Sequence, residues 1–254
     1  MIPKILHFCW LSDDPYPPLV KACLNSWREN MPDYEIMLWN TTTFDIESVP
    51  FVKQACVNRK WAFAADYIRL YALYNYGGIY LDSDVYLFRS LDDLLGFRAF
   101  SAIESCLDKD SFTVNIEAAF IGAERHHPFI KSCLDYYQGR QFQRPDGSFD
   151  QTILPLIIGD IAELKFGFER KAQAQNLNEG LHILSMEQFA HAHIETYSIS
   201  HCYGVHLCEG GWYNRGRLSS FKRLKSLMIR FRNKPVKTFF MLYWNYRLRN
   251  MLYK

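Results

Sequence analysis

Over the first 40 residues the apolar positions change from strand-like to helix-like spacing and back again. KILHFCW (4–10) is apolar and rich in strand-forming residues, and it ends at the turn-prone SDDPYPP. Residues 18–30 repeat apolar positions four apart, as a helix does, and YEIMLWN (34–40) returns to a strand pattern. This strand–helix–strand order predicts a parallel, Rossmann-like sheet, in which ligands bind beyond the carboxyl ends of the strands.

The strongest helical pattern covers residues 59–76. This stretch is rich in Ala, Leu and Tyr, and Gly77-Gly78 provide a C-terminal stop. The helix leads directly into GGIYLDSDVYLF (77–88), which predicts a strand. Residues 41–58, which precede the helix, are expected to be looser.

The middle of the chain predicts further strands and helices without an internal repeat. Strands are expected at 99–105 and 115–123 around a polar loop at 107–111, helices at 127–138 and at 150–164, a turn-rich loop at 139–149, and strands with loops over 181–212. The helix at 150–164 is expected to be broken by Pro155 and Gly159.

Composition places the chain among globular proteins. Its 254 residues are 49% hydrophobic and 22% charged, enough for one large α/β domain or two small ones. Aromatic residues, at 16%, suit stacking on sugars or nucleobases, although a tyrosine-rich core would give the same value. Seven scattered cysteines without a CxxC pair favour a reducing, cytosolic compartment. Neither a signal peptide nor an apolar stretch of about 20 residues is evident.

Charge is distributed unevenly along the chain. There are 29 Lys and Arg against 27 Asp and Glu. Ten of the basic residues and none of the acidic ones lie in 219–254, so residues 1–218 carry 19 against 27, a formal charge of −8. The basic segment is also amphipathic and aromatic, which is typical of elements that lie on anionic membrane surfaces. Helices docked on the body or in an oligomer interface are the alternative, and nucleic-acid binding is disfavoured by the acidic body.

Two carboxylates interrupt the strand predicted at 77–88. Side chains alternate along a strand, so Asp82 and Asp84 are expected on one side. Paired carboxylate oxygens suit Mg²⁺ or Mn²⁺, which leave their other positions to phosphate and water. The alternative is a strand end whose carboxylates face solvent or pair with Lys or Arg. Upstream, Asp66 and Arg69 are three residues apart on the predicted helix, where they form an ion pair or reach a ligand together.

Taken in order, these motifs resemble a known family. The strings IPKILHFCW, WAFAADYIRLYALYNYGGIYLDSDV and FIGAERHHPF resemble glycosyltransferase family 32, over about residues 1–132. That family includes bacterial capsule and lipopolysaccharide enzymes and initiating mannosyltransferases of yeast type, and it is related to the glucosyltransferase domains of clostridial toxins. The resemblance implies a GT-A fold: an α/β, Rossmann-like domain with a mixed, mostly parallel central sheet flanked by helices. We expect this catalytic domain over 1–218, with a basic helical extension at 219–254.

The resemblance also implies roles for individual residues. Trp10 is expected to stack on the nucleobase, with core packing as the alternative. Asp66 is expected to bind ribose or sugar hydroxyls, Arg69 the donor sugar, Asp82 the ribose and sugar, and Asp84 the metal.

A late element of the family supplies a further metal ligand and closes the site. YGVHLCEGGW resembles it, with His206 as the ligand and Trp212 against the diphosphate. The match is looser here, because Gly211 stands where the family has serine. Glu209 is an alternative ligand, and His201 is a weaker one.

The resulting prediction is a retaining, metal-dependent glycosyltransferase. It would move a hexose from a nucleotide-diphospho-sugar, UDP-sugar being favoured over GDP-sugar, to a hydroxyl of a saccharide or membrane lipid, in surface polysaccharide or glycolipid synthesis. The expected cofactor is Mn²⁺ or Mg²⁺. Gln151 is expected to contact the reacting sugar, as are Glu104, Asn115 and Asp150, with solvated loop positions as the alternative for all four.

Other functions and the location follow from the same features. A non-catalytic nucleotide-sugar-binding subunit of a membrane assembly is the alternative function, and a metal phosphohydrolase would need more ligands for two metals than the sequence offers. The predicted location is cytoplasmic, peripheral on the inner face of the cytoplasmic membrane.

Overall fold

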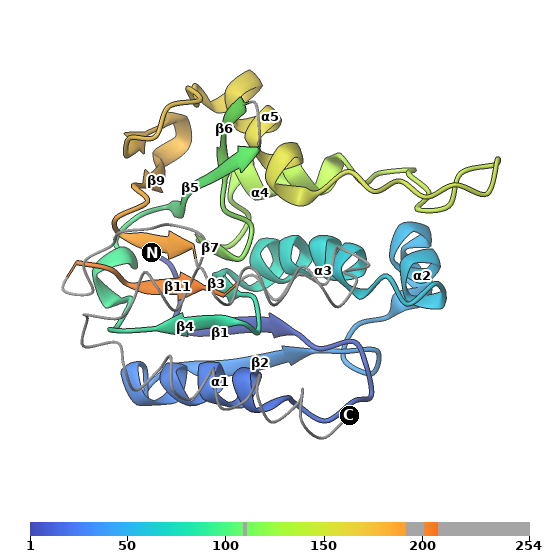
Figure 1. The fold of residues 1–254 in the computed structure, drawn as a ribbon, viewed down its shortest axis with the longest axis horizontal. Coiled ribbons are helices and arrows are strands. Elements are labelled where there is room, and N and C mark those ends of the chain that lie inside the picture. Colours follow the sequence, from blue (N-terminus) through green and yellow to red (C-terminus); the bar gives the residue numbers. More distant parts are fainter. Residues whose placement is uncertain (109–110, 192–200, 208–254) are drawn as a thin grey trace.

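A mixed β-sheet runs through the molecule in the computed structural model, which describes residues 1–108, 111–191 and 201–207 (Figure 1). Its strands are β1 (Ile5–Cys9), β2 (Glu35–Trp39), β3 (Gly78–Leu81), β5 (Ala99–Asp108), β6 (Ser111–Ile116), β7 (Phe120–Ala123), β8 (Gln175–Asn176) and β9 (Leu181–Leu184). They are ordered β2-β1-β3-β7-β5-β9-β8, with β6 paired to β5. A smaller sheet has the order β10-β11-β4, from Phe189–His191, Gly204–His206 and Val85–Leu87.

The opening of the chain has the predicted parallel arrangement. β1 pairs in parallel with both β2 and β3, and the helix α1 (Pro18–Asn30) connects β1 to β2. Pro18 suits the first turn of α1, since the amide nitrogens there have no partner within the helix. β7 is antiparallel to β3 and to β5, and β5 is parallel to β9. The predicted α/β class, with a mixed sheet flanked by helices, is confirmed.

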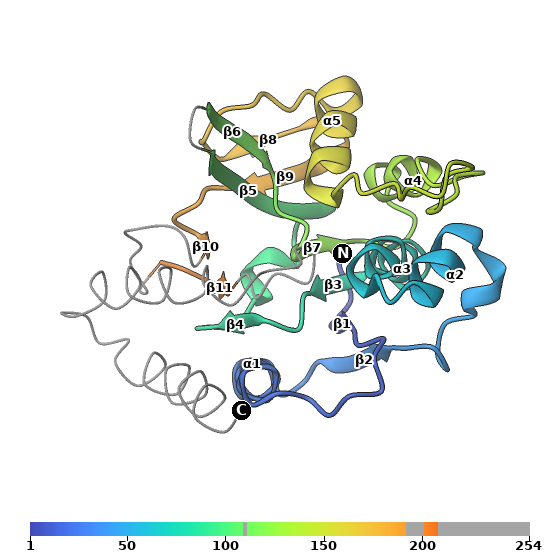
Figure 2. The same cartoon turned by 45° about the vertical axis from the view of Figure 1, so that its right-hand side comes forward.

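Helices cover both faces of the central strands (Figures 1 and 2). Leu6 and Phe8 of β1 belong to the same hydrophobic cluster as Trp27 of α1. Cys9 and Tyr80, on the opposite face, belong to a second cluster. That second cluster includes residues of α2 (Pro50–Val57), α3 (Trp61–Tyr76), α4 (Pro128–Asp135) and α5 (Leu154–Phe166). Because both faces are buried, the strands show continuous apolar runs instead of alternation.

The turn from α3 into β3 depends on two glycines and a histidine. Gly77 and Gly78 have positive φ angles of 66° and 105°, and a Cβ on Gly78 would lie 2.6 Å from the carbonyl oxygen of Ile5. The Trp39 indole N–H donates to Nδ1 of His7 at 3.1 Å, so Nε2 of the neutral ring carries the proton. That nitrogen donates to the carbonyl oxygen of Gly77 at 2.7 Å. The turn that delivers β3 is therefore fixed to β1.

Two predicted elements differ from the structure. The expected loose region at 41–58 contains a short 3₁₀ turn, Ile46–Ser48, and the helix α2. The helix predicted to break at Pro155 and Gly159 is continuous in α5. Pro155 lies in its first turn, where no intrahelical amide bond is lost.

The expected strand through the two aspartates is also wrong. Asp82–Asp84 form a turn between β3 and β4, in which the Val85 N–H donates to the Asp82 carbonyl at 2.9 Å. β4 leaves the main sheet and pairs with β11 instead. The expected strand at 115–123 likewise divides into the end of β6 and β7, separated by 117–119.

Several predictions concern residues beyond these bounds. Trp212, Glu209 and the basic segment 219–254 lie outside the described residues. No helix in the described part of the chain is long and apolar enough to cross a membrane. Five cysteines there are buried: Cys9, Cys23, Cys56, Cys133 and Cys202.

Candidate active site

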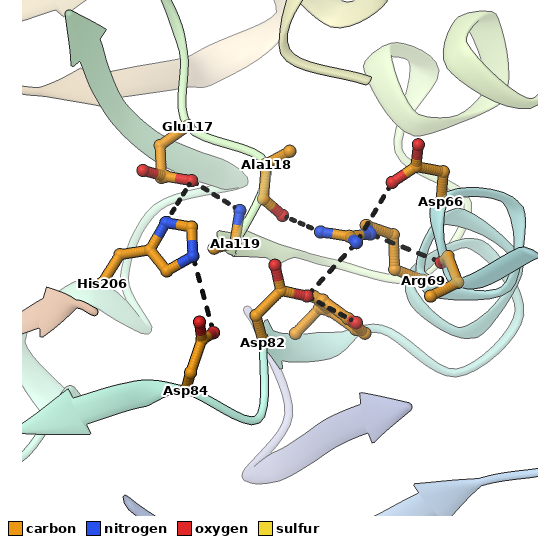
Figure 3. A network of polar contacts seen from close by, with 10 residues as sticks. Asp66, Arg69, Asp82, Asp84, Glu117, Ala118, Ala119 and His206 are labelled. Carbon is orange, nitrogen blue, oxygen red and sulfur yellow. Dashed lines mark hydrogen bonds and ion pairs between the residues drawn. The ribbon is translucent and has the colours of Figure 1, made fainter. Parts of the chain in front are cut away.

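Polar side chains from four parts of the chain meet beyond the carboxyl end of β3 (Figure 3). This position agrees with the expectation for parallel strands. They are Asp66 and Arg69 of α3, Asp82 and Asp84 of the turn after β3, Glu117 of the 117–119 segment, and His206 of β11.

Arg69 connects three of these parts. Its side chain is only 2% exposed, and its Nη2 lies 3.1 Å from Oδ1 of Asp66 and 3.2 Å from Oδ1 of Asp82. Its Nη1 donates to the carbonyl oxygen of Ala118 at 2.7 Å, and the guanidinium lies 4.5 Å from the ring centroid of Tyr80. The predicted i,i+3 pair with Asp66 is present, and Asp82 extends it. Arg69 therefore holds α3, the turn and the 117–119 segment together.

Asp66 is the acidic partner in the α3 ion pair. Its side chain is 1% exposed. Burial raises the pKa of its carboxyl well above the ordinary value, although the charge of Arg69 opposes this rise. Burial disfavours the charged form of this carboxyl, and a hydrogen-bond donor that reached it would favour the charged form and lower its pKa.

Asp82 is fixed by two hydrogen bonds besides the ion pair. The Tyr80 hydroxyl donates to its Oδ1 at 2.9 Å, and its backbone N–H donates to the carbonyl oxygen of Ala119 at 3.0 Å. Burial raises the pKa of the Asp82 carboxyl; Arg69 counteracts this, while the nearby Asp84 adds to it. With its side chain still 23% exposed, Asp82 is open to a positively charged ligand from the solvent side.

Asp84 and His206 meet because β4 pairs with β11. The pairing places His206 opposite Val85, and the Leu207 N–H donates to the Asp84 carbonyl at 3.1 Å. Nε2 of His206 then lies 3.5 Å from Oδ1 of Asp84. The predicted ligand pair, Asp84 and His206, is thus brought together although 122 positions separate the two residues in the sequence.

The donor set fits a hard divalent cation. One ligand atom each of Asp82, Asp84 and His206 lies within 4.8 Å of the others. Opposite ligands of an octahedral Mg²⁺ are about 4.2 Å apart, given bonds of about 2.1 Å, so a small contraction would bring these atoms into range. Two carboxylates and an imidazole also suit Mn²⁺.

Glu117 was not predicted as part of the site. Its side chain is 1% exposed, and its Oε1 accepts the Ala119 N–H at 2.7 Å and lies 3.5 Å from Nδ1 of His206. The signal in the sequence was an acid within the apolar stretch NIEAAFIGA, the same type of anomaly that drew attention to Asp82 and Asp84.

The remaining predicted residues have other surroundings. Trp10 follows β1, where its indole N–H donates to the Asp14 carbonyl at 2.8 Å and its ring packs edge-on against Tyr16. Gln151 is exposed in the segment before α5, and among the described residues no hydrogen bond joins it to the cluster. His201 is exposed in a turn before β11. The roles predicted for Trp10 and Gln151 stay predictions.

The other expected sugar contacts lie in the β5–β6 ladder and before α5. Asp150 lies 3.6 Å from both Arg140 and Arg144, and Asn115 accepts from Arg170 at 2.6 Å. Glu104 lies opposite Asn115 in the β5–β6 ladder.

The sequence matches a family model described as the glycosyltransferase sugar-binding region containing the DXD motif, over residues 17–101. The chain is 33% identical over 138 residues to the mannosyl phosphorylinositol ceramide synthase SUR1 of Saccharomyces cerevisiae, covering 53% of this chain and 34% of that protein. It is 33% identical over 133 residues to inositol phosphoceramide mannosyltransferase 3 of Schizosaccharomyces pombe, covering 51% and 35%. The matched region thus spans about a third of the length of these relatives.

Two solved structures give weaker matches to the chain. The PaToxG glycosyltransferase has a TM-score of 0.46 at 16% identity, covering 65% of this chain and 70% of that one. The galactosyltransferase LgtC, in complex with donor and acceptor sugar analogues, has a TM-score of 0.46 at 14% identity, covering 92% and 98%. The family match confirms the predicted resemblance to DXD-containing sugar transferases.

Proposed function

We propose that the protein is a metal-dependent hexosyltransferase, and the match of residues 17–101 to the DXD-containing sugar-binding region of glycosyltransferases supports this proposal. It takes a nucleotide-diphospho-sugar as donor and transfers the sugar, with retention, to a hydroxyl of a saccharide or membrane lipid. The observation that carries the proposal is the meeting of Asp82, Asp84 and His206 beside the buried Asp66–Arg69 pair.

Each residue of the cluster has a chemical task in this proposal. Asp84 and His206 would hold Mn²⁺ or Mg²⁺, with Asp82 within reach of the same ion. When bound, such a cation neutralises the negative charge that develops on the diphosphate leaving group. Asp82, oriented by Arg69 and the Tyr80 hydroxyl, also accepts hydrogen bonds from donor hydroxyls. Because Asp66 and Arg69 are buried, their electrostatic contacts with Asp82 act in a medium of low dielectric constant and are strong.

The acceptor and the location are proposed from the relatives and from charge. The names of two relatives describe mannosyl transfer to an inositol phosphoceramide, so mannose donors and inositol phosphoceramide acceptors are the first substrates to test. The excess of basic residues in 219–254 supports action at an anionic membrane surface. We place this surface on the cytoplasmic side, as predicted from the cysteine pattern.

A screen of UDP- and GDP-sugars tests the proposal. Each donor is added with Mn²⁺, and both the melting temperature and the release of nucleotide are measured. At least one donor should stabilise the protein only in the presence of metal, and Asp84→Asn should abolish this stabilisation. Asp33→Asn is the matched control, because Asp33 pairs with Lys4 before β2, at the opposite end of the parallel strands.

The outcomes separate the two functional classes. Stabilisation with turnover supports the transferase, whereas stabilisation by a donor without turnover with any acceptor or water indicates a binding subunit. If no nucleotide sugar stabilises the wild-type protein with Mn²⁺, and Asp84→Asn behaves like wild type, the proposal is wrong.

A further inference from the structure

Glu117 is a buried carboxylate that the proposed reaction does not use directly. It lies between β6 and β7, and its Oε1 faces two nitrogen atoms, the backbone N of Ala119 at 2.7 Å and Nδ1 of His206 at 3.5 Å (Figure 3). Removing a carboxylate from water is costly unless donors surround it. The Ala119 N–H and the His206 ring are among the contacts that stabilise Glu117, and these contacts in turn constrain Ala119 and His206.

The position of Glu117 suits the form of His206 that binds a cation. The ring lies between two carboxylates, with Nδ1 3.5 Å from Glu117 and Nε2 3.5 Å from Asp84. A cation held with Asp84 would take the lone pair of Nε2, and the ring proton would then reside on Nδ1, beside Glu117, which can only accept it. An imidazole that binds a cation needs this form, and metal-binding histidines commonly present their other nitrogen to a carboxylate.

We propose that Glu117 is a positioning residue that orients His206 for a divalent cation held together with Asp82 and Asp84. This inference rests on the proposed function. Glu117 is not itself a ligand here: its Oε1 is directed to Nδ1, on the opposite side of the imidazole from the nitrogen that faces Asp84.

The same segment also supports the other side of the cation site. Oε1 of Glu117 accepts the N–H of Ala119, whose carbonyl oxygen accepts the N–H of Asp82 at 3.0 Å. The Ser101 hydroxyl holds the backbone of Glu117 by donating to its carbonyl oxygen at 2.7 Å. The side chain of Glu117 therefore contacts both His206 and the Ala119 N–H, whereas the Ser101 hydroxyl contacts only the main chain of Glu117. Substitutions can separate these contributions.

Mn²⁺ binding to the full chain tests the proposal. Free Mn²⁺ is followed by EPR during titration of the metal alone, with UDP and with GDP. Glu117→Gln keeps an acceptor oxygen for Ala119 and removes the charge beside His206. We expect Mn²⁺ affinity to fall by about 10-fold or more, as for other residues that orient metal ligands. In a His206→Ala background the same substitution should cause no further loss, because Glu117 acts through His206.

Ser101→Ala is the matched control. It should lower the urea midpoint by removing a buried hydrogen bond while leaving Mn²⁺ affinity unchanged. Where Glu117→Gln is too unstable to titrate, Glu117→Asp replaces it. That variant keeps the charge but withdraws it from the ring by one methylene, and it should weaken Mn²⁺ binding as well.

Two results overturn the positioning role while the proposed function stands. One is wild-type Mn²⁺ affinity in the folded Glu117 variants, and the other is an equal loss with and without His206. A wild-type protein that binds no Mn²⁺ in any of the three titrations overturns the metal site and this inference together.

Discussion

His7 should make the stability of the fold depend on pH, and the structure allows the size of the effect to be worked out. Its ring is fully buried between Trp39 and the Gly77 carbonyl, and burial lowers its pKa from 6.5 to about 4. The unfolded chain therefore takes up a proton below about pH 6.5, whereas the folded chain does so only near pH 4. His7 contributes stability above pH 6.5 that is lost as the pH falls to 4, about 3 kcal/mol over the whole range.

The contribution can be isolated by substitution. His7→Gln keeps a donor for Gly77 and removes the titrating group. Between pH 7.5 and pH 5 the linkage relation gives a loss of about 2 kcal/mol from His7 in the wild type. Urea unfolding at both pH values should show that His7→Gln, although less stable at pH 7.5, loses about 2 kcal/mol less than the wild type on acidification. Comparing differences cancels the titration of the other carboxyl and imidazole groups.

A control and a contrary outcome complete the experiment. His201→Gln removes one exposed imidazole and serves as the reference for losing a histidine elsewhere. Equal losses on acidification in the wild type and in His7→Gln would show that His7 is not kept neutral by burial. The assignment of its Nε2 proton to the Gly77 carbonyl would then be wrong.

Three further predictions concern Arg69, Gly78 and the basic segment. Arg69→Met should destabilise the protein by about 3–5 kcal/mol in urea unfolding, because it leaves buried carboxylates unpaired. Adding Asp66→Asn should restore part of this loss, and a double variant whose destabilisation equals the sum of the two single losses would contradict the reasoning. Gly78→Ala should cost about 2 kcal/mol or more in the same assay, since its φ of 105° and the Ile5 carbonyl both oppose a Cβ, whereas Gly96→Ala, with open space around it, should cost much less. Replacing three basic residues of 219–254 by Gln should weaken binding to phosphatidylserine vesicles about 100-fold, at about 1 kcal/mol per charge, and unchanged vesicle binding would refute a membrane role.

The elements that were predicted from the sequence are those with a local cause. The helices α1 and α3 have apolar residues at helical spacing and a stop at Pro32 or Gly77, and both lie where the pattern placed them. α2 was missed because its eight residues, Pro50–Val57, are too few to show a clear period. The break predicted in α5 failed because a proline in the first turn removes no helical hydrogen bond.

For the site, the residue types were predictable and the connections among them were not. Asp66, Arg69, Asp82 and Asp84 form one contiguous motif, so the sequence indicated their proximity. The approach of His206 depends on the antiparallel pairing of β11 with β4, a long-range contact without a local signal. Glu117 reaches the site through the interruption between β6 and β7, which the expected continuous strand at 115–123 concealed.

The turn at Asp82–Asp84 gives the two aspartates different supports. Asp82 is attached to the main sheet through Ala119 and to α3 through Arg69. Asp84 is attached to the smaller sheet through the Leu207 N–H and faces His206. Had both residues lain in one strand, as the alternation predicted, a single sheet would have carried them.

Because each aspartate is hydrogen-bonded to a different sheet, a cation bound by both would link the two sheets. Metal binding would then hold β4 and β11 against β3, and the small sheet should resist unfolding more strongly when the metal is present. Amide hydrogen exchange measures this directly: Mn²⁺ should slow exchange in 204–207 and 85–87 more than in the β1–β2 pair. Equal protection of both regions would mean that the ion, where it binds, does not join the sheets. Glu117 also connects the two sheets, since its carboxylate faces His206 of the small sheet while its carbonyl oxygen is hydrogen-bonded to Ser101 of the large one.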